Sequence, residues 1–109
     1  MSAQPQNLQK STPVISIIPE GFCLDTYTCH PSHHRTTLAI HLAKKAHSVA
    51  HMYQDMMDYW NSVVRNAPTA TERLDARFEA EEYGRKAEER QQACRIWIEK
   101  ALFYEAEYQ

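Results

Sequence analysis

Glycine is nearly absent from this chain of 109 residues, which contains only Gly21 and Gly84. Neither glycine opens a glycine-rich turn, so the sequence has no loop of the kind that cradles phosphate groups. The longest largely apolar run, residues 14–18, is too short to span a bilayer. The first residues lack the charged start and apolar core of a signal peptide. We therefore expect a cytoplasmic protein without a membrane partner.

An excess of charge of either sign is also lacking. Twelve Lys and Arg residues stand against 14 Asp and Glu residues, for a net charge of -2 with neutral histidines. This balance provides no strong field for nucleic acid, so direct nucleic-acid binding is not expected. Cysteine is scarce, at three residues, and an odd number without an export signal indicates reduced thiols.

What the sequence does have is a seven-residue apolar repeat in each half of its C-terminal two-thirds. The first half contains the series Leu42, Val49, Met56 and Val63, interleaved with Ala39, Ala46, Tyr53 and Trp60. The second half contains Ala80, Ala87, Cys94, Ala101 and Tyr108, interleaved with Ala76, Tyr83, Trp97 and Tyr104. Two interleaved series of this kind are typical of helices that pack along their whole length.

The ends of both helices can be read from capping residues and proline. The first helix is predicted to begin near Ser32 and to run to about Arg65, because Pro68 disfavours helix at the residue before it. Thr69 and Glu72 form a capping box that starts a second helix, which runs to about Glu107. A connection of about four residues makes the helices antiparallel neighbours, with residue i opposite about 135 − i. The predicted fold is all-α: a long antiparallel helical hairpin, similar to a coiled coil, over residues 32–109.

The N-terminal third is predicted to divide into two segments. Residues 1–12 contain too few apolar side chains to fold and are expected to be disordered. Residues 13–31 should form a short extended arm and a loop, because β-branched residues lie between Pro13 and Pro19.

One hairpin does not use all the apolar side chains. Leu74, Phe78, Ile96 and Phe103 should lie opposite the small-residue series of the second helix, and the N-terminal arm, a second copy or a foreign protein must cover them. We expect a homodimer that forms a four-helix bundle, with Ile96 and Phe103 in the added interface. The candidate partner-binding residues are Ile17, Phe22, Phe78, Ile96 and Phe103.

Histidine is concentrated between residues 30 and 51, where all six histidines lie. His47, His51 and Asp55 are spaced i, i+4 and i+8, so two imidazoles and a carboxylate share one helical face and could hold a metal. The Glu of a catalytic HExxH motif is absent, since Ser48 follows His47. A second cluster runs from Cys23 to His34, with a spacing unlike that of a zinc knuckle. Metal binding is an alternative, and no cofactor is expected.

Cys94 is the one candidate nucleophile. The predicted register places it opposite His41 and Leu42, and a Cys–His pair could activate a thiolate. No third group is evident to orient the histidine, and Cys94 occupies a position that alanine fills elsewhere in the same series. We therefore predict a small core residue, no catalytic residues and no enzymatic activity.

These features together favour a non-enzymatic helical protein that binds and modulates a larger macromolecule, with a protein as the expected partner. Adaptors and inhibitors of the kind that phages and plasmids use work in this way, because a rigid hairpin presents a long surface at little ordering cost. The first alternative is a metal-binding sensor or metalloenzyme that uses the histidine-rich segment 30–51. The second alternative is a nucleic-acid-associated regulator.

Overall fold

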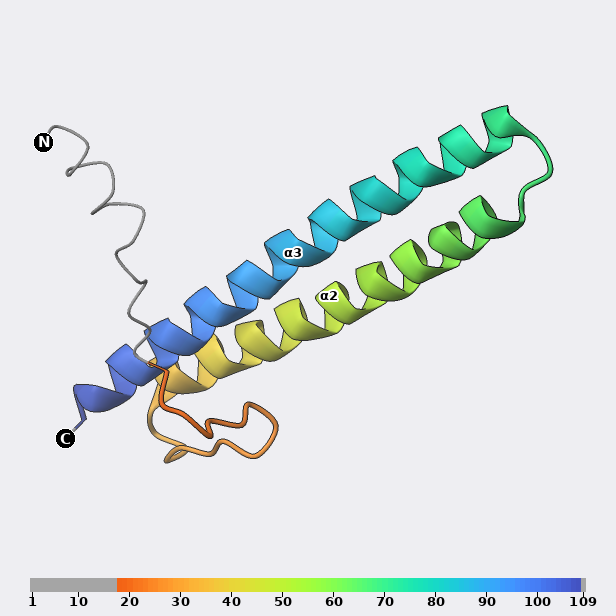
Figure 1. Cartoon of the computed structure of the whole chain (residues 1–109). Coiled ribbons are helices and arrows are strands. Elements are labelled where there is room, and N and C mark those ends of the chain that lie inside the picture. The colour runs from red at the N-terminus through yellow and green to blue at the C-terminus, as the bar shows by residue number, and fades with distance from the viewer. Residues whose placement is uncertain (1–17, 109) are drawn as a thin grey trace, which may run out of the picture.

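A computed structural model describes residues 18–108, which form two long helices joined by a short turn (Figure 1). Helix α2 spans His34–Asn66 and helix α3 spans Ala70–Ala106. The helices run antiparallel, side by side, and residues 18–108 contain no strand. The predicted all-α hairpin is confirmed. The predictions for residues 1–17, including the disordered segment, most of the arm and Ile17, lie outside the described residues.

The turn between the helices, at what we call the tip, contains the predicted N-cap Thr69 but not the reciprocal backbone contact of a full capping box. Ala67 is extended, as expected for a residue before proline. The Thr69 hydroxyl accepts a hydrogen bond from the backbone N–H of Glu72 at 3.1 Å and donates to the Glu72 carboxylate at 3.0 Å. The Arg73 guanidinium donates to the Ala67 carbonyl at 3.0 Å. These contacts satisfy groups that would otherwise be orphaned at two helix ends.

The seam between the helices is lined mostly by small side chains. The buried residues of α2 are Thr36, Ala39, Ile40, Ala43, Ala46 and Ala50. Those of α3 are Ala76, Ala80, Ala87, Cys94, Ile98 and Ala101. Small side chains on both sides allow the two helix axes to approach closely.

The predicted α3 series is confirmed at Ala76, Ala80, Ala87, Cys94 and Ala101, but Tyr108 is exposed and buried Ile98 was not part of it. The predicted α2 series is half wrong. Ala39 and Ala46 are buried as predicted, but the series interleaved with them continues through Ala43 and Ala50 rather than Leu42 and Val49. The buried positions are thus shifted by one residue from the predicted ones. This shift rotates the face that α2 buries by about 100° around the helix axis. The apolar periodicity of a sequence shows which side of a helix is apolar. Which part of that side is buried depends on where small residues let the two helices pack closely.

The register along the seam is shifted from the predicted one. Tyr53 packs against Tyr83 with ring centroids 6.0 Å apart, where residue 82 was predicted. Met57 fills the space beside Gly84, where an added Cβ would lie 3.0 Å from its sulfur. The prediction placed residue 78 there. The α3 partners are thus displaced by one and six residues toward its C-terminus.

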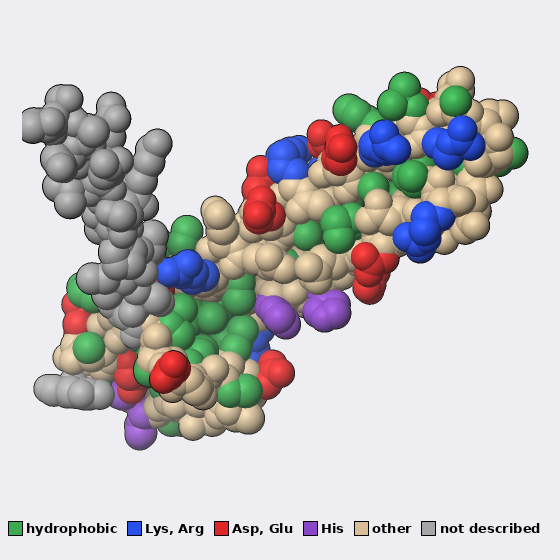
Figure 2. Space-filling view, viewed as in Figure 1, with side chains coloured by type: hydrophobic (Ala, Val, Ile, Leu, Met, Phe, Trp, Pro, Cys, Tyr) green, Lys and Arg blue, Asp and Glu red, His purple; other side chains and the backbone are tan. Residues whose placement is uncertain are grey.

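At the base of the hairpin, opposite the tip, the loop before α2 packs onto both helices (Figure 1). Ile18, Phe22 and Leu24 pack on the buried cluster of Ala43, Ala46, Cys94 and Ile98, and Tyr27 packs on the cluster of Ala39, Ile40 and Ala101. Figure 2 shows hydrophobic side chains gathered there. Both buried hydrophobic clusters of the described residues lie at the base, so the tip half depends on the small-residue seam.

Candidate functional site

An open groove lies at the tip, between the end of α2, the turn and the start of α3. Its volume is about 880 Å³. Its apolar lining consists of Trp60, Val63, Ala67, Pro68, Ala76 and Phe78. Trp60 contributes a ring whose Nε1 is buried without a hydrogen-bond partner among the described residues. Such an unsatisfied donor favours a rearrangement or a bound group that supplies an acceptor.

The polar lining of the groove is acidic. Glu72, Asp75 and Glu79 come from successive turns of α3, and Ser62 and Asn66 come from α2. None of the residues that line the groove is Lys, Arg or His. The groove therefore combines an apolar floor with a negative rim, which suits an occupant that is apolar and basic. We call this the tip groove.

The outer face of α3, turned away from the seam, carries a second apolar surface. Leu74, Phe78, Ile96 and Phe103 are between 51% and 64% exposed. The prediction that these four side chains lie opposite the seam is confirmed by their exposure. Leu74 and Phe78 lie near the tip and also line a hollow of about 360 Å³ with Asp75, Arg77 and Glu81. Ile96 and Phe103 lie near the base.

Charged residues occupy the outer face of α3 between these two apolar patches. The Arg85 guanidinium donates to Glu89 at 2.7 Å and to Glu82 at 2.8 Å. The hydrogen bond from Arg85 lowers the pKa of the Glu82 carboxyl. The middle of the outer face of α3 is therefore charged and solvated, and the exposed apolar side chains lie toward the two ends of the helix.

The remaining predicted partner residue in the described chain, Phe22, is not available at the surface in the same way. It is half-buried, packs on the cluster around Ile98, and its ring centroid lies 5.4 Å from that of Tyr27. Phe22 therefore helps to hold the loop on the helices. Its sequence neighbourhood gave no sign of this contact, because the contact depends on tertiary packing.

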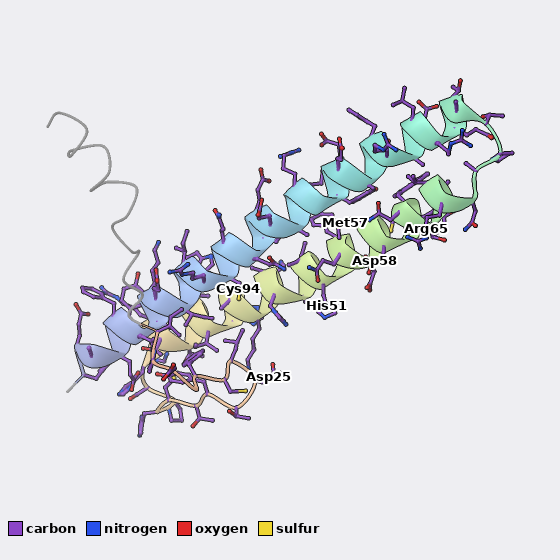
Figure 3. All side chains as sticks on the ribbon, in the orientation of Figure 1. Asp25, His51, Met57, Asp58, Arg65 and Cys94 are labelled. Carbon is purple, nitrogen blue, oxygen red and sulfur yellow. The ribbon has the colours of Figure 1, made fainter. Side chains whose placement is uncertain are left out.

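The histidine-rich segment does not assemble into a ligand set. The His47 and His51 rings lie 5.9 Å apart and both residues are exposed. Figure 3 shows His51 and Asp58 projecting from the side of α2 away from α3. Within residues 18–108, no three His, Cys, Asp or Glu side chains are grouped so that they could hold a metal ion, neither around Asp55 nor in the Cys23–His34 cluster.

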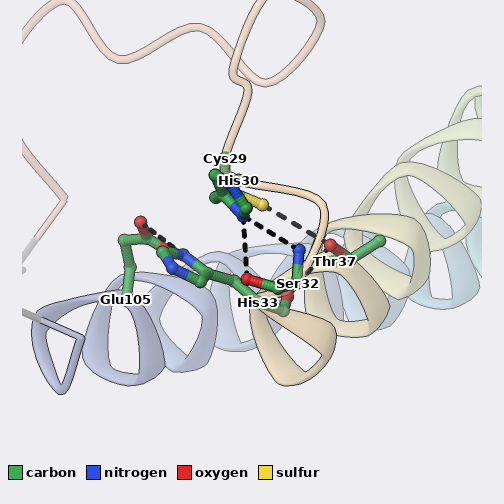
Figure 4. A network of polar contacts seen from close by, with 6 residues as sticks. All are labelled: Cys29, His30, Ser32, His33, Thr37 and Glu105. Atoms are coloured by element: carbon green, nitrogen blue, oxygen red, sulfur yellow. Dashed lines mark hydrogen bonds and ion pairs between the residues drawn. The ribbon is translucent and has the colours of Figure 1, made fainter.

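A polar network at the base was not predicted from the sequence (Figure 4). The His33 Nδ1 lies 2.9 and 3.0 Å from the two carboxylate oxygens of Glu105, and the His33 ring stacks on Tyr108 at 3.7 Å. His30 Nδ1 lies 2.8 Å from the Ser32 hydroxyl. The positions of the two residues in the sequence could have indicated this contact. His33 directly precedes the first helix and Glu105 lies in the last turn of the second. Antiparallel packing brings these two ends together.

Cys94 is buried in the seam, as predicted, but without the predicted histidine. Cys94, labelled in Figure 3, packs with Ala43, Ala46 and Ile98. His41 is exposed. Burial raises the pKa of the Cys94 thiol. A buried thiol with a raised pKa is a poor nucleophile, so this position does not form a Cys–His pair.

No family model, curated protein or solved structure matches this chain. No helix among residues 18–108 is both long enough and apolar enough to cross a membrane. The described residues present two candidate binding surfaces, the tip groove and the outer face of α3.

Proposed function

We propose that this chain is a non-enzymatic, dimeric helical hairpin that binds a protein partner through the outer face of α3 and thereby modulates a larger assembly. The observation that carries the proposal is the exposure of Leu74, Phe78, Ile96 and Phe103 on a helix whose opposite face is already buried. Exposed apolar side chains grouped on one face are typical of interaction sites.

The spacing of these side chains indicates the kind of partner. Leu74 and Phe78 lie four residues apart and share a helical face with Ile96 and Phe103. An amphipathic helix laid along α3 would place apolar anchors at both ends and polar groups near Arg85 in the middle. Aromatic anchors such as Phe103 contribute strongly to binding when a partner desolvates them.

The rest of the hairpin supports this mode of action. Both helices are held along the small-residue seam and closed at the base, so the outer face of α3 is ordered before any partner binds. A preordered surface loses little conformational entropy on association. Adaptors and inhibitors, including those of phage or plasmid type, use such surfaces. We place the function in the cytoplasm, because Cys23, Cys29 and Cys94 are all free thiols.

Photo-cross-linking in the source cell tests the proposal. A photoreactive phenylalanine analogue at Phe103 or Ile96 should give the same discrete cross-linked product. The matched control carries the analogue at Glu88, which is exposed on the same helix but outside the apolar face. Phe103→Glu should reduce capture of the identified partner by about tenfold or more. Equal products from all three positions, or none from Phe103 and Ile96, would leave the outer face without a partner.

A further inference from the structure

One flank of α2 carries a nearly continuous apolar stripe. Its members are Leu38, Leu42, Val49, Met52, Met56, Tyr59 and Val63. At 100° per residue they fall within a sector of about 100°, beside the seam, which also contains His41 and Lys45. The Lys45 ammonium can extend past the apolar side chains to water. Leu38, Met52, Met56 and Tyr59 are between 37% and 59% exposed. None of the seven belongs to the clusters on which the loop packs. We call this surface the α2 stripe; its tip end, at Val63, lines the tip groove.

The α2 stripe of one copy can pair with the α2 stripe of a second copy that runs in the opposite direction. A two-fold axis that passes beside α2, perpendicular to it and level with the midpoint of residues 50 and 51, pairs residue i with residue 101 − i of a second copy. Three pairs then join apolar side chains: Leu38 with Val63, Leu42 with Tyr59, and Val49 with Met52. The list of apolar positions is therefore nearly palindromic, which is the property that an antiparallel pairing of identical helices needs.

The charges along α2 favour the same antiparallel arrangement. Lys44 and Lys45 lie on the base side of the axis, and Asp55 lies on the tip side. Reversal brings Asp55 of one copy beside Lys44 and Lys45 of the other. A parallel arrangement would instead place like charges together, which costs free energy and selects against it.

The base of the hairpin has the chemistry that the tip groove requires. The Arg35 guanidinium lies 5.8 Å from the centroid of the Tyr104 ring, and the Lys100 ammonium lies 4.7 Å from the Trp97 ring. Arg35 also lies 3.9 Å from Glu107, and Leu38, in the first turns of α2 at the same end of the hairpin, is 59% exposed. The same two-fold axis carries Arg35 and Leu38 of one copy to residues 66 and 63 of the other, and both of these line the tip groove.

We infer that a second copy of this chain docks antiparallel on the α2 stripe, with the base of each copy seated in the tip groove of the other. Arg35 and Lys100 would meet the carboxylates of Asp75 and Glu79, while Leu38 enters the apolar floor. The docked face, which consists of the stripe and the neighbouring side of α3, is about 38 Å long and about 20 Å wide. The resulting area is near the roughly 800 Å² per partner that stable interfaces bury.

This inference rests on the self-association in the proposed function and names its surface. The second copy covers the α2 stripe and the tip groove and produces a four-helix bundle. Phe78 lines the tip groove and is covered in the dimer. Leu74, Ile96 and Phe103, on the outer face of α3, remain outside the dimer and free for a foreign protein. A failure of the dimer would leave the cross-linking test at Phe103 unaffected, so the two proposals can fail separately.

Sedimentation equilibrium of the full chain tests the inference. Wild type should be dimeric at about 100 µM, a range in which weak specific dimers are populated. Met52→Glu lies at the centre of the α2 stripe and should give monomers with unchanged helix content by circular dichroism. Ile96→Glu is the matched control on the outer face and should stay dimeric.

A charge exchange tests the seating of the base in the tip groove. Asp75→Lys and Lys100→Glu should each weaken the dimer by about tenfold, and the double variant should recover most of the loss. Monomeric wild type, a dimer broken by Ile96→Glu but not by Met52→Glu, or no recovery in the double variant would overturn the inference. A wild type that is monomeric but becomes dimeric when residues 1–17 are removed would also overturn it. In that case residues 1–17, rather than a second copy, would cover the α2 stripe.

Discussion

His33 and Glu105, which are 72 residues apart in the sequence, join the start of α2 to the end of α3. The His33 Nδ1–H donates to a carboxylate whose two oxygens lie 2.9 and 3.0 Å away. The side chains are only 18% and 21% exposed, so water competes weakly for this contact. Together with the stack of His33 on Tyr108, the pair closes the base of the hairpin.

Removal of this contact should lower the free energy of unfolding. We expect His33→Ala and Glu105→Ala each to cost about 1–2 kcal/mol, because each leaves a largely buried polar group without its partner. The double variant should cost little more than either single one. Urea denaturation measures all three. Arg95→Gln, which breaks an exposed pair with Glu99 within α3, is the control and should cost less than about 0.5 kcal/mol.

The seam should reject larger side chains. Ala43 and Ala101 are completely buried, so Ala43→Leu and Ala101→Leu should each destabilise the hairpin by about 1–3 kcal/mol through overpacking. Thermal unfolding followed by circular dichroism measures the effect. Leu74→Ala, on the exposed outer face of α3, should change stability by no more than about 0.5 kcal/mol. Neutral leucine variants would show that the helices are not closely packed.

The cysteines should differ in reactivity. A hydrogen bond from Thr26 lowers the pKa of exposed Cys23, whereas burial raises the pKa of Cys94. Iodoacetamide should therefore alkylate Cys23 well before Cys94 in the folded chain, as followed by mass spectrometry of quenched samples. In denaturant the two rates should converge. Equal rates in the folded chain would contradict the burial of Cys94.

The raised pKa of Cys94 also sets the sign of a pH effect. The folded chain favours the neutral thiol, so this contribution to stability is complete below the unfolded pKa, near about 8.5. It is lost as the pH rises through the folded pKa. Cys94→Ala should remove that part of the alkaline decline, which urea denaturation at several pH values above 8 would detect.

The two-helix hairpin could be predicted from the sequence, because the ends of its helices are set by local residues. Pro68 ends the first helix, and Thr69 caps the second through the Glu72 N–H as predicted, although the Glu72 carboxylate accepts from the Thr69 hydroxyl rather than from its backbone N–H. The choice between Leu42 and Ala43 as the residue that faces α3 could not be made from one helix alone. It depends on how closely two faces approach, which both helices determine together.

The surfaces were predictable in part. The exposure of Phe78, Ile96 and Phe103 follows from their position opposite a small-residue series, and helical geometry alone gives it. The tip groove depends on how the turn places Trp60 against α3, and no local pattern contains that information. Phe22 was assigned to a partner because its packing against the base depends on a tertiary contact.

The small-residue seam separates the positions that hold the hairpin together from those that face outward. Ala43, Ala87 and Ala101 tolerate little but small side chains, whereas Leu74 and Phe103 contribute little to the seam. Substitutions on the outer face can therefore change what the hairpin recognises without unfolding it. Such a scaffold is suited to rapid divergence of binding specificity, and to grafting of a new recognition sequence onto α3 with the seam left unchanged.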